Sequence, residues 1–510
     1  MELVAGKFGV FRNVVVRFLL FSLLIVIIRF AYVITIRGES CVAGDDFCFF
    51  SATASTGNHN LVTAAAGGGH TGRSSVILNP TAAASPEFHK RVMFYITVFQ
   101  DLIVDGFLNT QSKSLCLETP AGEDVYALRE IGVEDSVGIF KKAMKPLVVN
   151  GLGFRQPFED NTFDFIFSGN GVLDRSDKTA LFASEIGRTL KPEGYVVVHT
   201  GSKDTYSFNS FIRLFNCCKF ISSREFDGFD SDLPRVHEIV MKKEIDMKIR
   251  SKTDPNSKNS VGSCSVPGYK QELLKKAEPL IESEPLKPWI TLKRNIENVK
   301  YLSSMADIGF KNRYVYVDVG ARSYGSSIVS WFKKQYPKQN KTFDIYAIEA
   351  DKHFHDQYKS KKGVTLLPYA AWVRNESLVF EINQTPGDEN VETGRGMGRI
   401  QAAKTGGGIV GSTDVIQGFD FADWLKNTVT ENDFVVMKMD VEGTEFDLIP
   451  RLIETGAICL IDEVFLECHY NRWQKCCPGV RSPKYQKSYG QCLDLFKSLR
   501  QRGVLVHQWW

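Results

Sequence analysis

The sequence lacks any marked excess of charge of one sign. Its 62 lysine and arginine residues nearly balance 59 aspartate and glutamate residues, which leaves a formal net charge of +3 over 510 residues. So small an excess gives no support for a nucleic-acid partner. Hydrophobic residues make up 43% and charged residues 24% of the chain, and this ordinary globular composition excludes a largely disordered protein. Because 510 residues exceed what one hydrophobic core usually supports, we expect two domains.

The eleven cysteines lack the spacing of a zinc site or of a small disulfide-rich module. They are odd in number and include the adjacent pairs Cys217–Cys218 and Cys476–Cys477. Cys468 and His469 lie shortly before the second pair, but the spacing matches no standard metal motif. We therefore assign no metal ligands from the sequence and expect a few disulfides instead.

The N-terminal region contains a long apolar run. From Asn13 to Ile36 it has about the twenty residues that a helix needs to cross a bilayer. Arg17 and Arg29 lie near its ends, where their side chains can reach the interface. No small-residue cleavage site follows, which favours a retained anchor over a signal peptide; a transit peptide or a buried helix is the alternative. Basic residues precede the run, so the sequence predicts a single-pass type II membrane protein of the Golgi or endoplasmic reticulum, its bulk in the lumen.

Composition divides the chain into five segments. Residues 1–37 read as a cytosolic tail and transmembrane anchor, and residues 38–87, which are rich in Ala, Gly, Ser and Thr, as a flexible stem. Strands alternate with helices in residues 88–243 and again in residues 286–510, which predicts parallel sheets covered by helices. Residues 244–285 lack a periodic apolar face and form the linker. The predicted fold class is α/β, with two tandem Rossmann-like domains after an N-terminal transmembrane helix.

A glycine-rich stretch, Asn383–Gly418, separates two recognisable parts of the second segment. Before it, Ala370–Val373 and Leu378–Ile382 are expected to form a strand pair. Long loops of this composition are usually disordered, and we expect disorder here. The alternative is a lid, in which Arg395 and Arg399 would meet an acidic substrate.

Polar residues follow two apolar strands at the start of the second α/β segment. Asp318, Gly320 and Gly325 lie where the first strand gives way to a helix, and glycines there allow a ligand to approach the backbone and the helix N-terminus. Glu349 ends the next strand, where a carboxylate can accept hydrogen bonds from both ribose hydroxyls of a nucleoside. The alternative is that Glu349 is only a solvated strand end.

A third polar element ends a later strand, in the run KMDVEGTE. Lys438 and Asp440 share a side-chain direction, because strand residues two apart point to one face. Glu442 begins the following helix. Ligands of open α/β sheets bind at the carboxyl ends of the strands, where all three polar elements are expected to lie.

The runs DVGA, IEAD and KMDVEGTEFDLI, with FDFADWL before the last, resemble the FkbM family of methyltransferases over about Asn312–Glu467. Members use S-adenosyl-L-methionine as cofactor, so the resemblance implies this cofactor here. It implies the following cofactor-binding residues: Asp318, Gly320, Gly325 and Glu349. It also implies that Asp440 and Glu442 lie at the methyl end of the cofactor. The loop departs from the family pattern DVGANxG, because Arg322 replaces the Asn and the last glycine comes one residue later.

The first α/β segment is similar to the class I methyltransferase domain over Ser114–Thr200. The runs QPFEDNTFDFIF and LKPEGYVVV match its middle strands. In contrast, Leu115–Gly122 lacks the GxGxG of a cofactor loop, and the second strand ends in Ile139 and Phe140 without an acidic residue. This domain is therefore predicted to be degenerate and structural. The whole arrangement also resembles a plant group of membrane-anchored methyltransferase-like proteins.

These patterns predict a membrane-anchored, S-adenosylmethionine-dependent methyltransferase that methylates an oxygen of a saccharide or small metabolite. A hydroxyl acceptor needs a base within hydrogen-bond reach. Asp440 is the first candidate and His469, after the last core strand, the second; Lys438 and Glu442 complete the catalytic candidates.

Two other functions remain open from the sequence. The displaced Gly325 favours a non-catalytic scaffold that has lost turnover. A Golgi-type glycosyltransferase would need a metal–nucleotide motif, for which Asp230-Ser-Asp232 is the candidate. That motif lies between two antiparallel-looking strands, so we interpret it as a hairpin turn.

Overall fold

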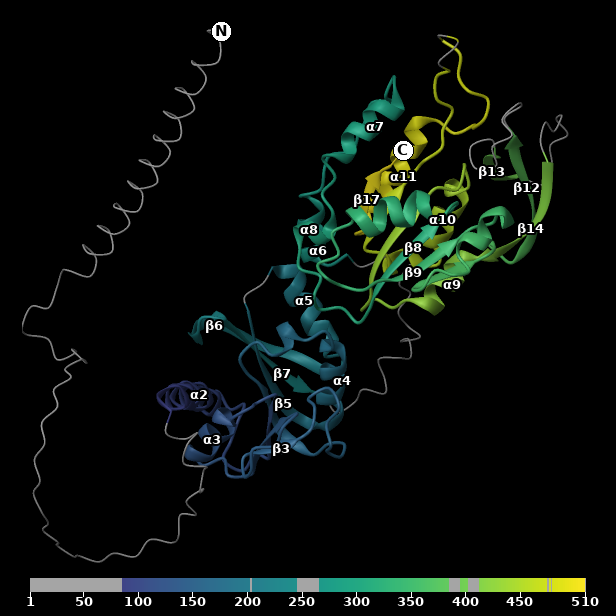
Figure 1. Cartoon of the computed structure of the whole chain (residues 1–510). Helices are drawn as coiled ribbons and strands as arrows, with labels where there is room; N and C mark the ends of the chain where they lie inside the picture. Colours follow the sequence, from purple (N-terminus) through teal and green to yellow (C-terminus); the bar gives the residue numbers. More distant parts are fainter. Residues whose placement is uncertain are drawn as a thin grey trace, which may run out of the picture. The chain divides into compact units, whose positions relative to one another are not determined.

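The computed structural model describes residues 85–201, 204–244, 266–384, 395–401, 412–474, 477 and 479–509 (Figure 1). The predicted span at residues 13–36 and the stem up to residue 84 lie outside these ranges. Within them, no helix combines the length and apolar character needed to cross a membrane. This finding overturns the predicted localisation as a single-pass type II protein of the Golgi or endoplasmic reticulum. It also leaves the membrane unsupported as a partner.

A seven-stranded sheet in the order β3-β2-β1-β4-β5-β7-β6 forms the first α/β region, residues 85–244. Its strands are β1 (Ser114–Leu117), β2 (Ser136–Phe140), β3 (Val148–Asn150), β4 (Phe163–Ser168), β5 (Leu190–Gly201), β6 (Cys218–Asp230) and β7 (Leu233–Lys243). Its helices are α2 (Pro86–Val104), α3 (Glu123–Glu130), η1 (Leu173–Arg175), α4 (Thr179–Thr189) and α5 (Thr205–Leu214). Strands β1 to β5 pair in parallel, whereas β7 joins antiparallel to both neighbours.

The Asp230-Ser-Asp232 motif lies in the turn between β6 and β7. The two strands pair antiparallel up to Asp230 and Leu233, and the Asp232 amide donates a hydrogen bond of 3.1 Å to the Asp230 side chain. This is the turn in which an aspartate side chain caps its own backbone two residues on. The interpretation as a hairpin turn is confirmed.

A six-stranded, wholly parallel sheet forms the second α/β region, residues 266–509, in the order β10-β9-β8-β15-β16-β17. Its strands are β8 (Tyr314–Val319), β9 (Asp344–Ile348), β10 (Val364–Leu367), β15 (Phe434–Met439), β16 (Glu463–Leu466) and β17 (Leu505–Gln508). Its helices are α6 (Gly268–Leu274), α7 (Pro288–Ile296), α8 (Leu302–Met305), the π-helix η2 (Gly325–Lys333), η3 (Lys352–Gln357), α9 (Phe421–Thr428), α10 (Glu445–Glu454), η4 (Ala457–Leu460) and α11 (Tyr489–Gln501).

The order of the parallel strands decides where a ligand can bind. Strand order in this sheet reverses between β8 and β15, which lie side by side at its centre. Such a switch point opens a crevice outside the carboxyl ends of the strands. The predicted α/β class with parallel sheets is thus confirmed, while the boundaries of two tandem domains stay a prediction. Helix α6 falls inside the stretch predicted as linker.

The prediction for the glycine-rich stretch Asn383–Gly418 is wrong in part. A four-stranded sheet contains β11 (Ala370–Trp372), β14 (Ser412–Asp420), β12 (Glu376–Gln384) and β13 (Arg395–Gln401), in that order. Strands β13 and β14 come from the stretch expected to be disordered. Strands β11 and β12 do not pair with each other as expected, because β14 lies between them. Residues 385–394 and 402–411 lie outside the described residues.

Strand β15 shows why the central strands are continuous apolar runs. All six of its residues are buried. Val435, Met437 and Met439 pack into a core with α9, α10 and α11, whereas Phe434 and Val436 pack into a second core on the other face. A parallel strand covered by helices on both faces needs apolar residues at every position. Lys438 interrupts this pattern while remaining buried, and its charge lies near the carboxylates of Asp318 and Asp440.

Candidate functional site

A cleft of about 720 Å³, open solvent at its mouth included, lies at the switch point. The carboxyl ends of β8, β9 and β15 form one side, and the four-stranded sheet contributes the other. Its lining residues are Val319, Gly320, Arg322, Ile348, Glu349, Ala350, Asp351, Phe354, Tyr369, Ala370, Ala371, Phe380, Gly398, Arg399, Ile400, Asp440, Val441, Glu442 and Thr444. Of the predicted site residues, Gly320, Glu349, Asp440 and Glu442 therefore meet here.

Gly320 allows two strand ends to touch. Its φ is +82°, a conformation that side chains rarely adopt, and a Cβ there would lie 1.9 Å from the backbone oxygen of Asp440. Its amide donates to the Ile348 carbonyl at 3.0 Å. Only glycine can occupy this position without moving the loops that line the cleft.

Glu349 links the loops after β8 and β9. Its two carboxylate oxygens accept the Arg322 amide at 2.6 Å and the Asp351 amide at 2.7 Å. Burial raises its pKa to about 7, against those two hydrogen bonds. Each carboxylate oxygen can accept more than one hydrogen bond. Glu349 therefore has acceptor capacity left for hydroxyl groups of a ligand in the cleft.

Asp318 and Lys438 lie beneath the cleft as register partners on β8 and β15. The Lys438 ammonium is 3.8 Å from the Asp318 carboxylate and 3.9 Å from that of Asp440. Burial lowers the pKa of Lys438, but the neighbouring carboxylates outweigh it, so the pKa lies above its ordinary value. Asp318 is fully buried and accepts a hydrogen bond from Tyr316 at 3.1 Å. It supports the strand ends and is absent from the cleft lining.

Gly325 does not join the other predicted residues. It is exposed at the start of η2, and a side chain there would meet no atom within 4 Å. The reason is the length of the loop, which brings Gly325 into the first turn of the helix. Arg322, two residues after Gly320, takes a positive φ of 48° instead.

Arg399 lines the cleft but already has partners. Its guanidinium contacts the buried Glu381 carboxylate at 2.8 and 2.9 Å and donates to the Lys484 carbonyl at 3.1 Å. These contacts hold β13 against the loop before α11. The charge of Arg399 is thus balanced within the protein, whereas the lid interpretation expected this charge to meet an acidic substrate.

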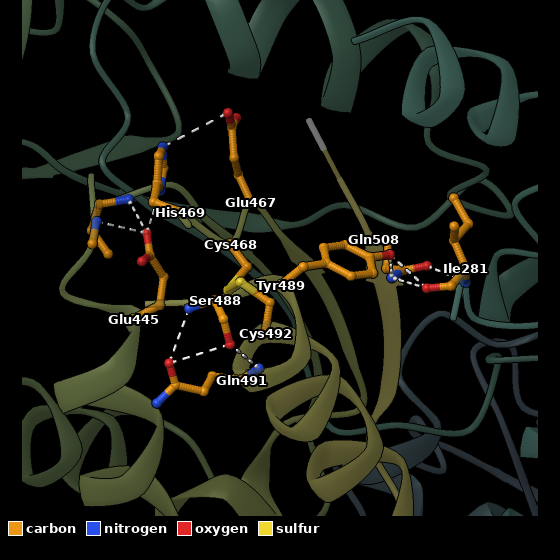
Figure 2. Close-up of a disulfide and its surroundings, with 12 residues drawn as sticks. Ile281, Glu445, Glu467, Cys468, His469, Ser488, Tyr489, Gln491, Cys492 and Gln508 are labelled. Atoms are coloured by element: carbon orange, nitrogen blue, oxygen red, sulfur yellow. Dashed lines mark hydrogen bonds and ion pairs between the residues drawn. A yellow bond between two sulfur atoms is a disulfide. The ribbon is translucent and has the colours of Figure 1, made fainter. Parts of the chain in front are cut away.

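His469 lies close to four carboxylates, of which Figure 2 shows those of Glu445 and Glu467. Its Nδ1 donates to Glu445 at 2.8 Å. Its Nε2 faces three carboxylate oxygens, of Asp440 at 3.7 Å and of Glu442 and Glu467 at 3.8 Å. Burial lowers the pKa of His469, but the surrounding carboxylates outweigh it and raise the pKa to about 9.

The three carboxylates differ in their surroundings. Burial and the charge of Asp440 raise the pKa of Glu467 to about 8. Burial also raises the pKa of Asp440, although Lys438 and His469 oppose it. Glu442 has the reverse shift: burial raises its pKa, but the charge of His469 and hydrogen bonds from Lys484 and Tyr485 outweigh this and hold the pKa below its ordinary value.

The sequence did not point to three residues that hold this group in place. Glu445 is fully buried and accepts the amides of Val441 and Gly443 as well as His469. Lys484 donates to Glu442 at 2.8 Å, and the Tyr485 hydroxyl donates to the same oxygen. Glu445 lies in the KMDVEGTE run and was within reach of motif analysis. No sequence pattern pointed to Lys484 or Tyr485.

A disulfide fixes the segment before His469. Cys468 is bonded to Cys492 of α11, 24 residues further along the chain (Figure 2). Cys459 is also disulfide-bonded. Of the adjacent cysteine pair that follows in the sequence, Cys476 lies outside the described residues and Cys477 is exposed.

Replacing Cys468 and Cys492 together by serine should lower the free energy of unfolding by about 3 kcal/mol, because the cross-link restricts a loop of this length in the unfolded chain. Urea unfolding of the oxidised protein and of the double variant measures the difference. Cys116→Ser, at a buried free cysteine, is the control for the thiol-to-hydroxyl change. A difference no larger than that of the control would contradict the prediction.

The strand ends of the first α/β region differ from those that line the cleft in the second region. Glu118 follows β1 and accepts the Gly153 amide at 2.7 Å. Thr119 donates to Asp124 at 2.6 Å. A Cβ on Gly122 would press on Leu147 and Val148 at 3.0 Å, so this glycine serves packing of the core rather than approach of a ligand.

Comparison with known families separates the two regions. Residues 127–198 match the family described as methyltransferase domain. The chain carries a methyltransferase domain. This match confirms the predicted enzyme class, an S-adenosylmethionine-dependent methyltransferase, with S-adenosylmethionine as its cofactor. It begins within α3 and so does not include the loop after β1.

The second region matches a different family. Residues 274–380 and 398–510 match a domain of unknown function (DUF7870). This description names no activity, so the resemblance to the FkbM family and to plant methyltransferase-like proteins stays a prediction. No curated protein matches the chain.

Solved structures resemble the chain only weakly. A Burkholderia thailandensis 1,6-didemethyltoxoflavin-N1-methyltransferase is 12% identical, over 32% of this chain and 91% of that chain, with a TM-score of 0.23. A putative sarcosine dimethylglycine methyltransferase from Galdieria sulphuraria is 14% identical, over 34% of this chain and 92% of that chain, with a TM-score of 0.24. At these values neither likeness carries an argument about this chain.

Proposed function

We propose that the cleft of the second α/β region binds S-adenosylmethionine and that the protein methylates an oxygen of a saccharide or small metabolite. One observation carries the proposal: Gly320, Glu349 and Asp440, from three strand ends, line the same cleft. Gly320 lets the ends of β8 and β15 approach closely beside the cleft, and Glu349 retains acceptor capacity for a ligand. In the first region the loop after β1 has neither feature, which supports a structural role for it.

The residues of the cleft have separate roles in this proposal. The adenine ring of the cofactor would lie against an apolar wall formed by Phe354, Tyr369 and Ala370. Glu349 accepts hydrogen bonds from the ribose hydroxyls. The bound cofactor supplies a methyl group on a positively charged sulfur. Asp440 accepts the proton of the acceptor hydroxyl at a carboxylate oxygen, with the Nε2 atom of His469 3.7 Å away. The cleft also excludes water and holds the acceptor oxygen in line with the methyl group, and this positioning supplies the rest of the rate enhancement.

Binding of S-adenosylhomocysteine to the full chain, measured by calorimetry, tests this function. Glu349→Ala should weaken binding about 30- to 100-fold, since it removes two hydrogen bonds between the ribose and the Glu349 carboxyl group. Glu454→Gln, at an exposed residue of α10, should leave binding unchanged. Binding that survives Glu349→Ala but is lost in Glu118→Ala would move the cofactor to the first region and contradict the proposal.

A further inference from the structure

We propose that Asp440, Glu442 and His469 bind one divalent transition-metal ion at the edge of the cleft. One ligand atom from each of these residues lies within 4.8 Å of the others. The three come from the end of β15 and from the segment after β16, which are neighbours in the sheet. The sequence named all three as catalytic candidates, but it did not group them as metal ligands, because His469 lies outside the KMDVEGTE run.

Distances around His469 Nε2 are those of ligands that share a metal. The Asp440, Glu442 and Glu467 oxygens are 3.7 to 3.8 Å from this nitrogen, which is too long for a hydrogen bond. A metal about 2.0 to 2.3 Å from each ligand requires ligand atoms that are separated by roughly 3 to 4 Å. The observed spacing therefore fits an ion held between the side chains. Glu467 is close enough to act as a fourth ligand.

The surroundings of His469 and Asp440 direct one atom of each residue toward the proposed ion. His469 is 4% exposed, and its Nδ1 donates to the buried Glu445, which leaves Nε2 directed at the carboxylates. Metal-binding histidines are held in this way by a carboxylate behind them. The Asp440 Oδ1 atom is buried and has no hydrogen-bond partner within the described part of the chain. Such an orphaned buried oxygen is costly unless a cation or donor meets it.

The neighbouring lysines meet only one oxygen of each carboxylate. Lys484 contacts Glu442 through Oε2, and the Oε1 atom of Glu442 faces His469 instead. Lys438 approaches Asp440 through Oδ2 at 3.9 Å, on the side away from the unpartnered Oδ1. One oxygen of each carboxylate is therefore held by a lysine, and the other is directed toward the imidazole.

The donor set selects the class of metal. One imidazole nitrogen with carboxylate oxygens favours Mn²⁺, Fe²⁺ or Zn²⁺ over Mg²⁺ and Ca²⁺, which prefer oxygen alone. Asp440 and Glu442 also line the cleft, so the ion would face a ligand there. Resting on the proposed function, this indicates an acceptor with two adjacent oxygens, such as a vicinal diol or hydroxy acid, that can chelate the ion. A bound metal lowers the pKa of a coordinated hydroxyl.

Titration of Mn²⁺ into the full chain after removal of metals by a chelator, followed by electron paramagnetic resonance, tests the site. We expect saturable binding of one Mn²⁺ per chain, with no competition from an equal concentration of Mg²⁺. Asp440→Asn and His469→Gln should each weaken binding at least about tenfold, and Glu445→Gln by about 10- to 100-fold through loss of its support of His469. Glu454→Gln on the outer face of α10 is the matched control and should bind as the unaltered protein does.

Binding that is absent, or that both Asp440→Asn and His469→Gln leave unchanged, would overturn the site. If either variant loses its circular dichroism spectrum, Glu442→Gln replaces it, with the same expected loss. S-adenosylhomocysteine calorimetry on the same samples separates the two proposals. Cofactor binding without Mn²⁺ binding overturns the metal site alone, and Mn²⁺ binding without cofactor binding overturns the proposed function alone.

Discussion

Replacing His507 by alanine should lower the free energy of unfolding by about 3 to 5 kcal/mol, because it leaves buried carboxylates without their partner. His507 is fully buried on β17. Its two ring nitrogens donate to Glu278 at 2.6 Å and to Glu463 at 2.8 Å. A histidine that donates from both nitrogens to carboxylates is an imidazolium ion. Removing it takes away the buried donor that Glu278 and Glu463 share.

The pH dependence of this network follows from two opposed shifts. Burial lowers the pKa of His507, but the two carboxylates outweigh it and raise the pKa. Burial raises the pKa of Glu278, but His507 outweighs it and lowers the pKa. The other polar side chains that face the network are Arg500, 3.6 Å from Glu278, and Tyr336, whose hydroxyl donates to Glu463.

The His507 contribution is therefore complete below about pH 6.5 and is lost as the pH rises through its raised pKa. The Glu278 contribution is present above about pH 4.3 and is lost as the pH falls through its lowered pKa. Urea unfolding of the unaltered protein and of His507→Ala should differ most near pH 5 to 6. His89→Ala, at an exposed histidine of α2, is the control and should change stability by less than about 0.5 kcal/mol. If the free energies of unfolding of the two proteins differ by the same amount at all pH values, the ion pair is contradicted.

Gly320→Ala should abolish binding of S-adenosylhomocysteine and cost about 3 kcal/mol or more of stability. The added methyl would lie 1.9 Å from a backbone oxygen, which cannot rotate away, so the ends of β8 and β15 must separate. The positive φ of 82° adds about 1 kcal/mol. Calorimetry and urea unfolding measure the two effects.

Gly456→Ala separates the effect of the positive φ from that of the clash with a neighbouring strand end. This glycine has a similar φ of +73°, but a Cβ there would meet no atom within 4 Å. Its substitution should cost only about 1 kcal/mol and leave cofactor binding intact. If the two alanine variants behave alike, the close approach at Gly320 has no functional meaning.

Much of the site was predictable because it lies in one continuous motif or at a strand end. Apolar runs mark β8, β9 and β15, and polar residues directly after such runs fall at the carboxyl edge of a parallel sheet. Gly320 and Glu349 were found in this way, and both line the cleft. Gly325 was misplaced, because the length of a loop does not tell where its helix begins.

The four-stranded sheet could not be predicted. Glycines and small polar residues in β13 and β14 give no alternation of apolar and polar positions. These strands exist because β14 pairs with β11 on one side and β12 on the other. Pairing of this kind depends on the neighbours, and sequence propensity does not report it.

The sequence by itself determined the α/β class, the alternation of strands and helices along the chain, and the residues at the strand ends, since hydrophobic periodicity is local. Only the tertiary structure decided which side chains meet. It brought His469 to Asp440 and Glu442, and His507 to Glu278 across 229 residues. The physical reason is that charges inside a protein must be paired, and the partners come from whichever segment the fold places beside them.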